Sequence, residues 1–172
     1  MDAWFTRESA RYFREVYLPR LQKAVDTLPE ADLWWRPHQG ATSVGNLLLH
    51  LEGNLRQWIL GGLGGAEERR RRAEEFARRE GGTRSELMGA LAATMTGAAD
   101  VIERATALDR RLSIQGFATT PREAIYHVVE HLSWHTGQVV WIAKMRAGAA
   151  HGIAFYDDAG LNAPKPPKPQ TR

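Results

Sequence analysis

The chain has 172 residues, of which 43% are hydrophobic and 25% are charged, and it contains no cysteine. This length and balance are typical of a single globular domain, and the lack of cysteine excludes disulfides, thiolate metal ligands and a cysteine nucleophile. The net charge of +3 is too small to indicate a polyanionic partner by itself. The N-terminus has no basic region followed by an apolar stretch, so we expect no signal peptide and a cytoplasmic protein.

Apolar residues at helical spacing predict a first helix over about residues 4–28. Pro19 lies inside this pattern and predicts a kink, because proline cannot donate the helical hydrogen bond. A loop is expected next, since Pro29 and the segment 36–40 carry residues that interrupt helices.

The second helix is expected to begin at a cap formed by Thr42 or Ser43 and to end at the glycines between 61 and 65. The stretch 44–63 is the most apolar in the chain, but charged residues and a histidine interrupt it. It is therefore predicted to be a core helix, and no membrane span is expected.

A highly charged connection over residues 66–80 follows, and it is predicted to be partly helical. Its arginine run, Arg69–Arg72, is interleaved with glutamates, which is typical of a solvated face with internal ion pairs. The whole connection from 61 to 82 is long enough to carry the chain back along a bundle, which would make the second and third helices parallel.

Two capping boxes mark the last two helices. The first, Thr83–Glu86, predicts a third helix that ends near Ala107. The second, Thr120–Glu123, predicts a fourth helix that continues to about Ala147 and stops at Gly148.

The predicted fold class is all-α, because no segment alternates apolar and polar residues long enough to predict a strand. Four helices of about 18–27 residues predict a four-helix bundle with a long crossover between the second and third helices. This bundle is expected over residues 1–150. Residues 151–172 are expected to form a C-terminal extension with an extended, proline-rich tail.

Three histidines in the fourth predicted helix, His127, His131 and His135, are spaced i, i+4 and i+8 on one helix face. About 0.007 such triplets are expected by chance, so the spacing favours a metal site over isolated buried histidines. An eight-residue step spans about 12 Å along a helix, far more than two metal–nitrogen bonds of about 2.0–2.1 Å. Only His127/His131 or His131/His135 can therefore share one ion, and a third ligand must come from another helix. His50, in the middle of the second helix, is the natural donor.

Three imidazole ligands leave an open coordination position, as catalytic zinc requires. A divalent ion is predicted, with zinc or nickel the most plausible, because both accept imidazole. Residues 127–131 also match the letters of the inverted zinc-protease motif. That alternative is disfavoured, because only Asp157 and Asp158 follow the fourth helix as further carboxylates.

Three segments together, 33–37, 43–54 and 130–138, resemble the DinB-like superfamily, and most closely an uncharacterised bacterial branch of it. The resemblance covers about residues 5–148. It implies a four-helix bundle with a long crossover, in which three histidines hold a divalent metal ion: His50, His131 and His135. It also implies a homodimer, and either thiol transfer with a low-molecular-weight thiol or metal-assisted hydrolysis.

Other side chains near the histidines are expected to orient the imidazoles or to line a pocket. They are His127, Gln138, Asn54, Asn46 and Trp134. No catalytic side chain is predicted, because the reacting group would be a metal-bound water or thiol.

The leading hypothesis is a divalent-metal-dependent enzyme, a thiol (S-)transferase or a hydrolase, acting on a small-molecule substrate. The alternative is a non-catalytic, metal-stabilised helical bundle that binds a small ligand or a protein partner. Nucleic-acid binding through Arg69–Arg72 is a third hypothesis, which the interleaved acidic residues disfavour.

Overall fold

The computed structural model describes residues 2–67 and 69–156, and it is mostly helical. The predicted proline-rich tail from residue 157 onward lies outside the described residues. In chain order the elements are α1 (Asp2–Arg11), a π-helical turn (Tyr12–Tyr17), α2 (Leu18–Asp26), a 3-10 turn (Glu30–Asp32), α3 (Val44–Leu55), a second π-helical turn (Arg56–Gly61), α4 (Arg72–Ala77), α5 (Arg84–Glu103), β1 (Leu112–Ile114), β2 (Phe117–Thr119), α6 (Pro121–Ala147) and a 3-10 turn (Gly148–Ala150).

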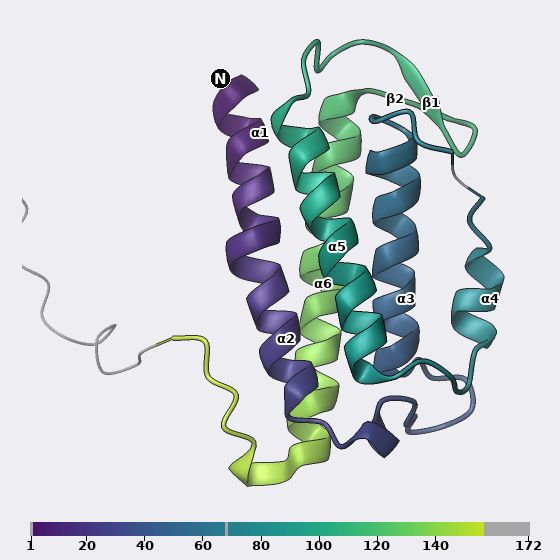
Figure 1. Cartoon of the computed structure of the whole chain (residues 1–172), viewed down its shortest axis with the longest axis vertical. Helices are drawn as coiled ribbons and strands as arrows, with labels where there is room; N and C mark the ends of the chain where they lie inside the picture. The colour runs from purple at the N-terminus through teal and green to yellow at the C-terminus, as the bar shows by residue number, and fades with distance from the viewer. Residues whose placement is uncertain (1, 68, 157–172) are drawn as a thin grey trace, which may run out of the picture.

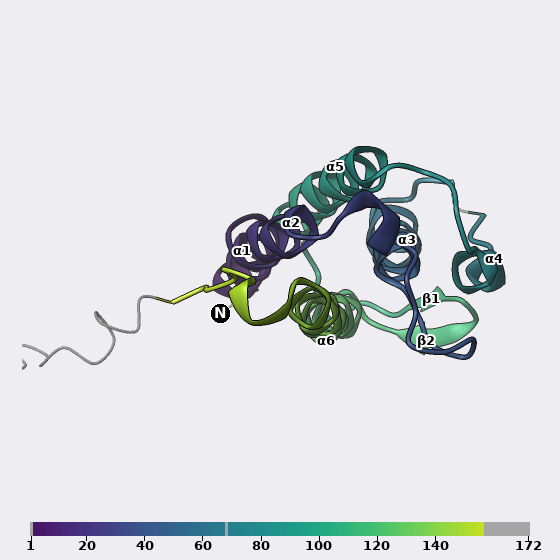
Figure 2. The same ribbon diagram turned by 90° about the horizontal axis from the view of Figure 1, so that it is seen from below.

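Four long helical rods lie side by side: α1 continued by α2, then α3, α5 and α6 (Figure 1). The connection after α3 returns along the outside of the molecule, so α3 and α5 run in the same direction (Figure 1). Seen from below, the four rods surround a common core, while α4 and the β1–β2 hairpin lie outside α3 (Figure 2). Within the described residues, no helix combines the length and the apolar character needed to cross a membrane.

The first rod passes Pro19 without a break, because the chain forms a π-helical turn just before it. The backbone N–H of Leu18 donates to the Phe13 carbonyl, five residues back in the chain. A π turn shifts the hydrogen-bond register of the helix, and Pro19 then lies in the first turn of α2, where its missing N–H is tolerated. Where the sequence predicts a kink, the structure thus has a change of helix type.

Three helices begin directly after the capping residues that the sequence predicts. Ser43 and Asn46 form a reciprocal capping box at the start of α3, and Thr83 and Glu86 form another at α5. The Thr120 hydroxyl accepts a hydrogen bond from the Glu123 backbone N–H at the start of α6. The predicted end of the third helix near residue 107 is wrong, because α5 ends at Glu103 and the chain turns into a loop.

A short antiparallel hairpin formed by β1 and β2 was not predicted. Its turn consists of Gln115 and Gly116, with φ of 56° and 81°, the signature of a tight hairpin turn. Three-residue strands are too short for alternating polarity to show in a sequence, so the all-α prediction missed them.

The core lies between the four rods and receives fully buried apolar side chains from each, for example Phe13, Leu51, Leu91 and Val128. Ile153 is also buried in this core. The packed part of the chain therefore extends slightly past the expected boundary at residue 150.

Candidate metal centre

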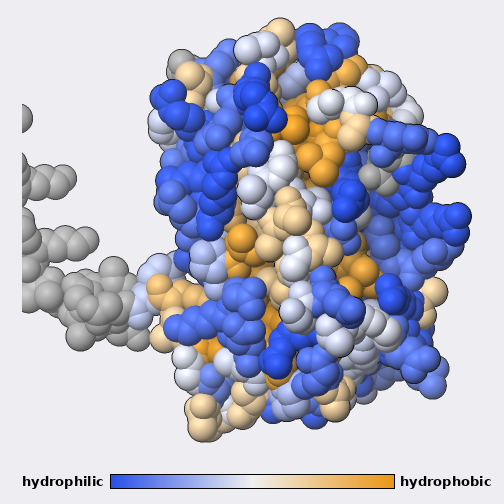
Figure 3. Space-filling view, in the orientation of Figure 1, coloured by the Kyte–Doolittle hydropathy of each residue, from blue (hydrophilic) through white to orange (hydrophobic). Residues whose placement is uncertain are grey.

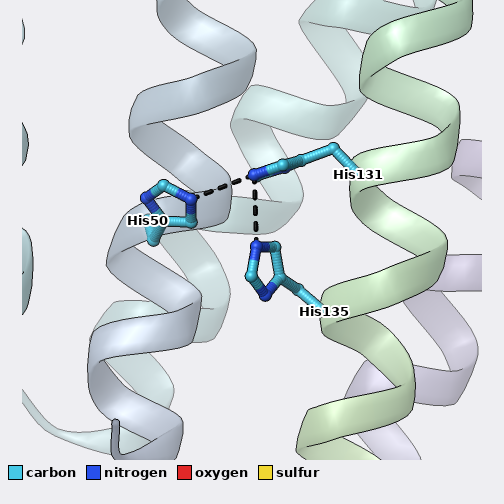
Figure 4. A group of neighbouring side chains, drawn as sticks. All are labelled: His50, His131 and His135. Atoms are coloured by element: carbon cyan, nitrogen blue, oxygen red, sulfur yellow. Dashed lines mark hydrogen bonds between the residues drawn. The ribbon is translucent and has the colours of Figure 1, made fainter. Parts of the chain in front are cut away.

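Three histidines from two helices converge at the middle of the α3–α6 seam (Figure 4). His131 Nε2 lies 3.0 Å from His50 Nε2 and 3.2 Å from His135 Nε2. Their ligand nitrogens all lie within 4.8 Å of one another. Nitrogens bound to one tetrahedral ion lie about 3.3 Å apart, as bonds of about 2.0–2.1 Å require. The group can therefore hold a divalent metal ion.

His131 and His135 are one turn apart on α6, which directs both rings toward α3. His127, one turn earlier, does not join this group. Its Nε2 lies 3.4 Å from Asn54 Nδ2, and its ring packs against Trp58 with centroids 4.4 Å apart. Of the two pairs that the spacing allows, the structure brings His131 and His135 together with His50 of α3.

The two outer imidazoles are held through their Nδ1 atoms. His50 Nδ1 lies 3.0 Å from Glu75 Oε2, and His135 Nδ1 lies 2.6 Å from Gln138 Oε1. Carboxylate and amide oxygens only accept hydrogen bonds, so both contacts favour the tautomer with the hydrogen on Nδ1. At His50 the Arg70 Nη2 donor, 2.8 Å from the same Nδ1, competes with the Glu75 contact. Each Nε2 is then left with a free lone pair directed toward the centre of the group, as metal ligation requires.

Glu75 is itself clamped by a buried arginine. Arg70 Nε lies 2.6 Å from Glu75 Oε1, and Arg70 Nη2 lies 2.8 Å from Glu75 Oε2. The two side chains are only 4% and 11% exposed. Burial raises the pKa of the Glu75 carboxyl, but the hydrogen bonds from Arg70 and His50 outweigh it, so its pKa lies below the ordinary value. The carboxylate is therefore charged where it meets the imidazole.

The arginine run is thus only partly a solvated face, and the prediction was wrong for Arg70. Its neighbours Arg69 and Arg71 are 86% and 77% exposed, and the right edge of Figure 3 is accordingly hydrophilic over α4. The exposure of these side chains differs because the chain that leads into α4 turns Arg70 toward α3 and leaves Arg69 and Arg71 in solvent.

The segment around α4 is fastened to α3 at several points. Asn46 Nδ2 donates to the carbonyls of Glu75 and Arg78, at 2.7 and 2.9 Å. The Phe76 ring lies 4.6 Å from the His50 ring. Asn46 therefore holds the α4 segment and does not contact an imidazole, while Asn54 contacts His127. Of the predicted orienting amides, only Gln138 touches one of the three histidines.

Gly53 allows the Arg70–Glu75 pair to approach α3. A Cβ at this position would lie 2.9 Å from Arg70 Nε, closer than real Cβ atoms approach a neighbour, and 3.1 Å from Glu75 Cδ, which is also unusually tight. A glycine inside a helix, three residues after a histidine, is the sequence signal that could have revealed this contact.

Replacing Gly53 with alanine is expected to destabilise the protein by about 1–3 kcal/mol, because the new methyl group overpacks a filled contact. Alanine normally stabilises a helix interior by about 0.5–1 kcal/mol relative to glycine. Gly89→Ala on α5 is the matched control, since nothing lies within 4 Å of a Cβ there. Urea unfolding of both variants measures the difference, and equal gains in stability would refute the contact.

Burial favours the neutral form of the two histidines that α6 contributes to the group. Burial, followed by the neighbouring imidazoles of His135, His50 and His127, lowers the pKa of His131 to about 3. Burial also lowers the pKa of His135, although its hydrogen bond to Gln138 opposes the shift. Neutral imidazoles are the form that binds metal ions.

The metal-free protein is therefore expected to lose stability as the pH falls from about 6.5 toward 3. Over this window an unfolded chain protonates His131 at its ordinary pKa of about 6.5, whereas the folded chain resists protonation until about pH 3. Protons then bind the unfolded state preferentially, and the folded state loses free energy. Urea unfolding of wild type and His131→Gln at pH 7, 5.5 and 4 tests this, since the wild type should lose more stability. Parallel pH profiles would contradict it.

Trp134 lies against the outer side of the centre. Its ring stacks on the His135 ring with centroids 6.0 Å apart and planes 16° apart, yet it is 62% exposed. Trp134 therefore lies beside His135 with one face open to solvent.

A family model described as "Protein of unknown function (DUF1572)" matches residues 4–153. This range includes all three converging histidines together with Arg70 and Glu75. Comparisons with curated proteins and with solved structures found no match.

Proposed function

Because this chain belongs to the DUF1572 family of proteins of unknown function, we propose its activity from the geometry of its three histidines. It is a divalent-metal-dependent enzyme that acts on a small molecule. The observation that carries the proposal is the convergence of three Nε2 atoms from α3 and α6, two of which belong to imidazoles whose Nδ1 atoms are already paired.

We also propose that the chain is a member of the DinB-like superfamily, and the arrangement of the rods supports this assignment. That resemblance implies a four-helix bundle with a crossover between the second and third long helices and a triad at these same three positions. The parallel course of α3 and α5 agrees with this topology.

Each residue of the centre has a separate task. His50, His131 and His135 would hold the ion. Because neutral imidazoles carry no charge, the ion would keep its full positive charge. A divalent ion held in this way lowers the pKa of a water molecule or a thiol that occupies its open position. Glu75 and Gln138 fix the outer imidazoles, and Trp134 screens one side from solvent.

The acidic groups favour a thiol over water as the nucleophile. Among the described residues, Glu75 is the carboxylate within hydrogen-bond distance of a ligand imidazole, and it already pairs with Arg70. It also meets His50 at Nδ1, on the ring edge away from the converging Nε2 atoms. No free carboxylate base is thus in place there, which suits a nucleophile that loses its proton readily. A thiol, with an ordinary pKa of about 8.5, meets this need better than water, so thiol (S-)transfer comes first and hydrolysis second.

Metal content and turnover together test the proposal. Purified protein should bind about one zinc or nickel ion per chain and should transfer a low-molecular-weight thiol to an electrophile such as 1-chloro-2,4-dinitrobenzene. His50→Ala should abolish both properties, whereas His127→Gln should retain the ion.

The non-catalytic alternative gives a different result. A cobalt-loaded protein whose absorption spectrum does not respond to added thiol, and which shows no turnover with thiol or ester substrates, would indicate a metal-stabilised bundle. A protein that binds no divalent ion at neutral pH would overturn the proposal altogether.

A further inference from the structure

A groove of about 410 Å³ lies between α3, α6 and the loop that precedes α3. Its α6 wall consists of residues at positions i, i+3, i+4, i+7 and i+8, which lie on one helix face. They are Trp134, Gly137, Gln138, Trp141 and Ile142. Leu47 of α3 and the loop residues Pro37, Ala41 and Thr42 complete the lining, and none of these described residues carries a charge.

The groove adjoins the metal centre through residues that belong to both. Gln138 lines the groove and binds His135 Nδ1 at 2.6 Å. Trp134 lines it as well and stacks on the ring of the same histidine. On α3, Leu47 lies one helical turn before His50. The groove is therefore the next part of the same α3–α6 seam.

Gly137 keeps the groove open. It lies inside α6, where glycine costs about 0.5–1 kcal/mol relative to alanine, and no atom lies within 4 Å of a Cβ built on it. A close approach of a neighbouring side chain therefore does not explain why position 137 is a glycine. Trp134 and Trp141 flank it about 10 Å apart along the helix axis, both 62% exposed. The missing side chain leaves a space between two unburied indoles.

We propose that this groove binds an uncharged aromatic group of the substrate and thereby places the reacting atom of that substrate at the three histidines. The inference rests on the proposed function and names its substrate class. An uncharged lining excludes ionic recognition, because a charged group would lose its hydration without gaining a partner. Exposed indoles beside an open space favour a flat ring, which gains area burial and aromatic stacking. The volume is within the range of small-molecule sites, about 300–1,000 Å³.

The groove is tested first without metal. Benzyl methyl sulfide has the aromatic ring but no thiol, and it should shift the indole N–H signals of Trp134 and Trp141 in NMR spectra of metal-free protein. Gly137→Leu fills the open space and should weaken this binding at least about tenfold. Gly89→Leu is the matched control, because Gly89 also has open space at its Cβ and lies away from the groove on α5. Circular dichroism checks that both variants fold.

The metal is added in a second step that separates the two proposals. In cobalt-loaded protein, benzyl mercaptan should bind at least about tenfold more tightly than the charged 2-mercaptoethanesulfonate, and Gly137→Leu should remove this preference. If both thiols give a cobalt charge-transfer band with equal affinity, the groove proposal is wrong and the proposed function stands. If benzyl methyl sulfide binds as expected but neither thiol gives a band, the groove binds aromatic groups and the thiol chemistry is wrong.

A second copy of the chain is the competing occupant of the groove. Sedimentation velocity of wild type and Trp141→Ala decides this point. A wild-type dimer that becomes a monomer in the variant, together with no binding of benzyl methyl sulfide, would assign the groove to a subunit interface and overturn the inference.

Discussion

Arg70→Ala is expected to destabilise the protein by about 3–5 kcal/mol, because it leaves the Glu75 carboxylate buried without its main partner. The side chain of Arg70 is only 4% exposed and makes two short contacts with Glu75. Arg71, its neighbour in the chain, pairs with Glu74 at the surface, where the side chains are 77% and 69% exposed. Arg71→Ala should therefore change the free energy of unfolding by less than about 0.5 kcal/mol. Chemical unfolding of the two variants gives the comparison, and similar small losses in both would show that the pair is not buried.

The double variant Arg70→Met/Glu75→Leu separates stability from metal binding. Replacing both members of a buried ion pair by apolar residues of similar size is often neutral for stability. The His50 Nδ1 atom, however, loses both of its hydrogen-bond neighbours, the Glu75 carboxylate and the Arg70 guanidinium. Loss of such a partner typically weakens metal affinity by about 10–100-fold. A double variant with recovered stability and unchanged zinc affinity would mean that Glu75 does not orient His50.

His131→Ala is expected to have the largest effect on metal binding, lowering affinity by more than about 100-fold, beyond the loss seen for an outer partner. This imidazole is the central member of the group, since its Nε2 lies within 3.2 Å of both other Nε2 atoms. Removing it leaves two donors, one on each helix, and three are needed for a typical catalytic site. Competition titration against a chromophoric zinc chelator measures the dissociation constant.

His127→Ala is the control for this experiment, because His127 stands one turn before His131 on the same helix. Its ring packs on Trp58 and its Nε2 faces Asn54, outside the converging group. We expect it to change zinc affinity by less than about threefold, within the usual effect of a remote substitution. A loss as large as that of His131→Ala would place His127 among the ligands.

The pairing of His50 with His131 and His135 could be anticipated because local spacing carries most of it. An i, i+4 pair must share one helix face, and a helical rod with an apolar face must turn that face to its neighbours. The choice between His127 and His135 needed the relative height of α3 and α6, which depends on how the two rods pack. Spacing alone left that choice open, and the family resemblance supplied it.

The Arg70–Glu75 pair could not be read from the sequence in the same way. Blocks of arginine and glutamate follow one another over residues 67–80, and nothing in the composition separates the buried members from those in water. Their burial follows from the docking of the α4 segment against α3, which joins residues far apart in the chain, for example 20 apart for His50 and Arg70 and 25 apart for His50 and Glu75. The glycine at position 53 is a local trace of that docking, but it becomes informative only when the neighbour that fills its space is known.

The β1–β2 hairpin and the early end of α5 have a related cause. Both lie in the connection before α6, where short-range preferences decide the backbone and apolar periodicity is weak. Ala107 and Gln115 adopt φ of 49° and 56° there, conformations that are uncommon for residues with a side chain. Periodicity describes long rods well and gives little information about such turns.

The convergence of His50 and His131 joins two points that are 81 residues apart in the chain. An ion bound there would cross-link two points separated by nearly half of the polypeptide, and unfolding could not be completed until the ion was released. Because ligands that bind only the folded form add RT ln(1 + [L]/Kd) to its free energy, a hundredfold excess over Kd would contribute about 2.7 kcal/mol. Metal supply in the cell would then set how long this protein survives proteolysis, and depletion of the ion would shorten its lifetime before any substrate is involved.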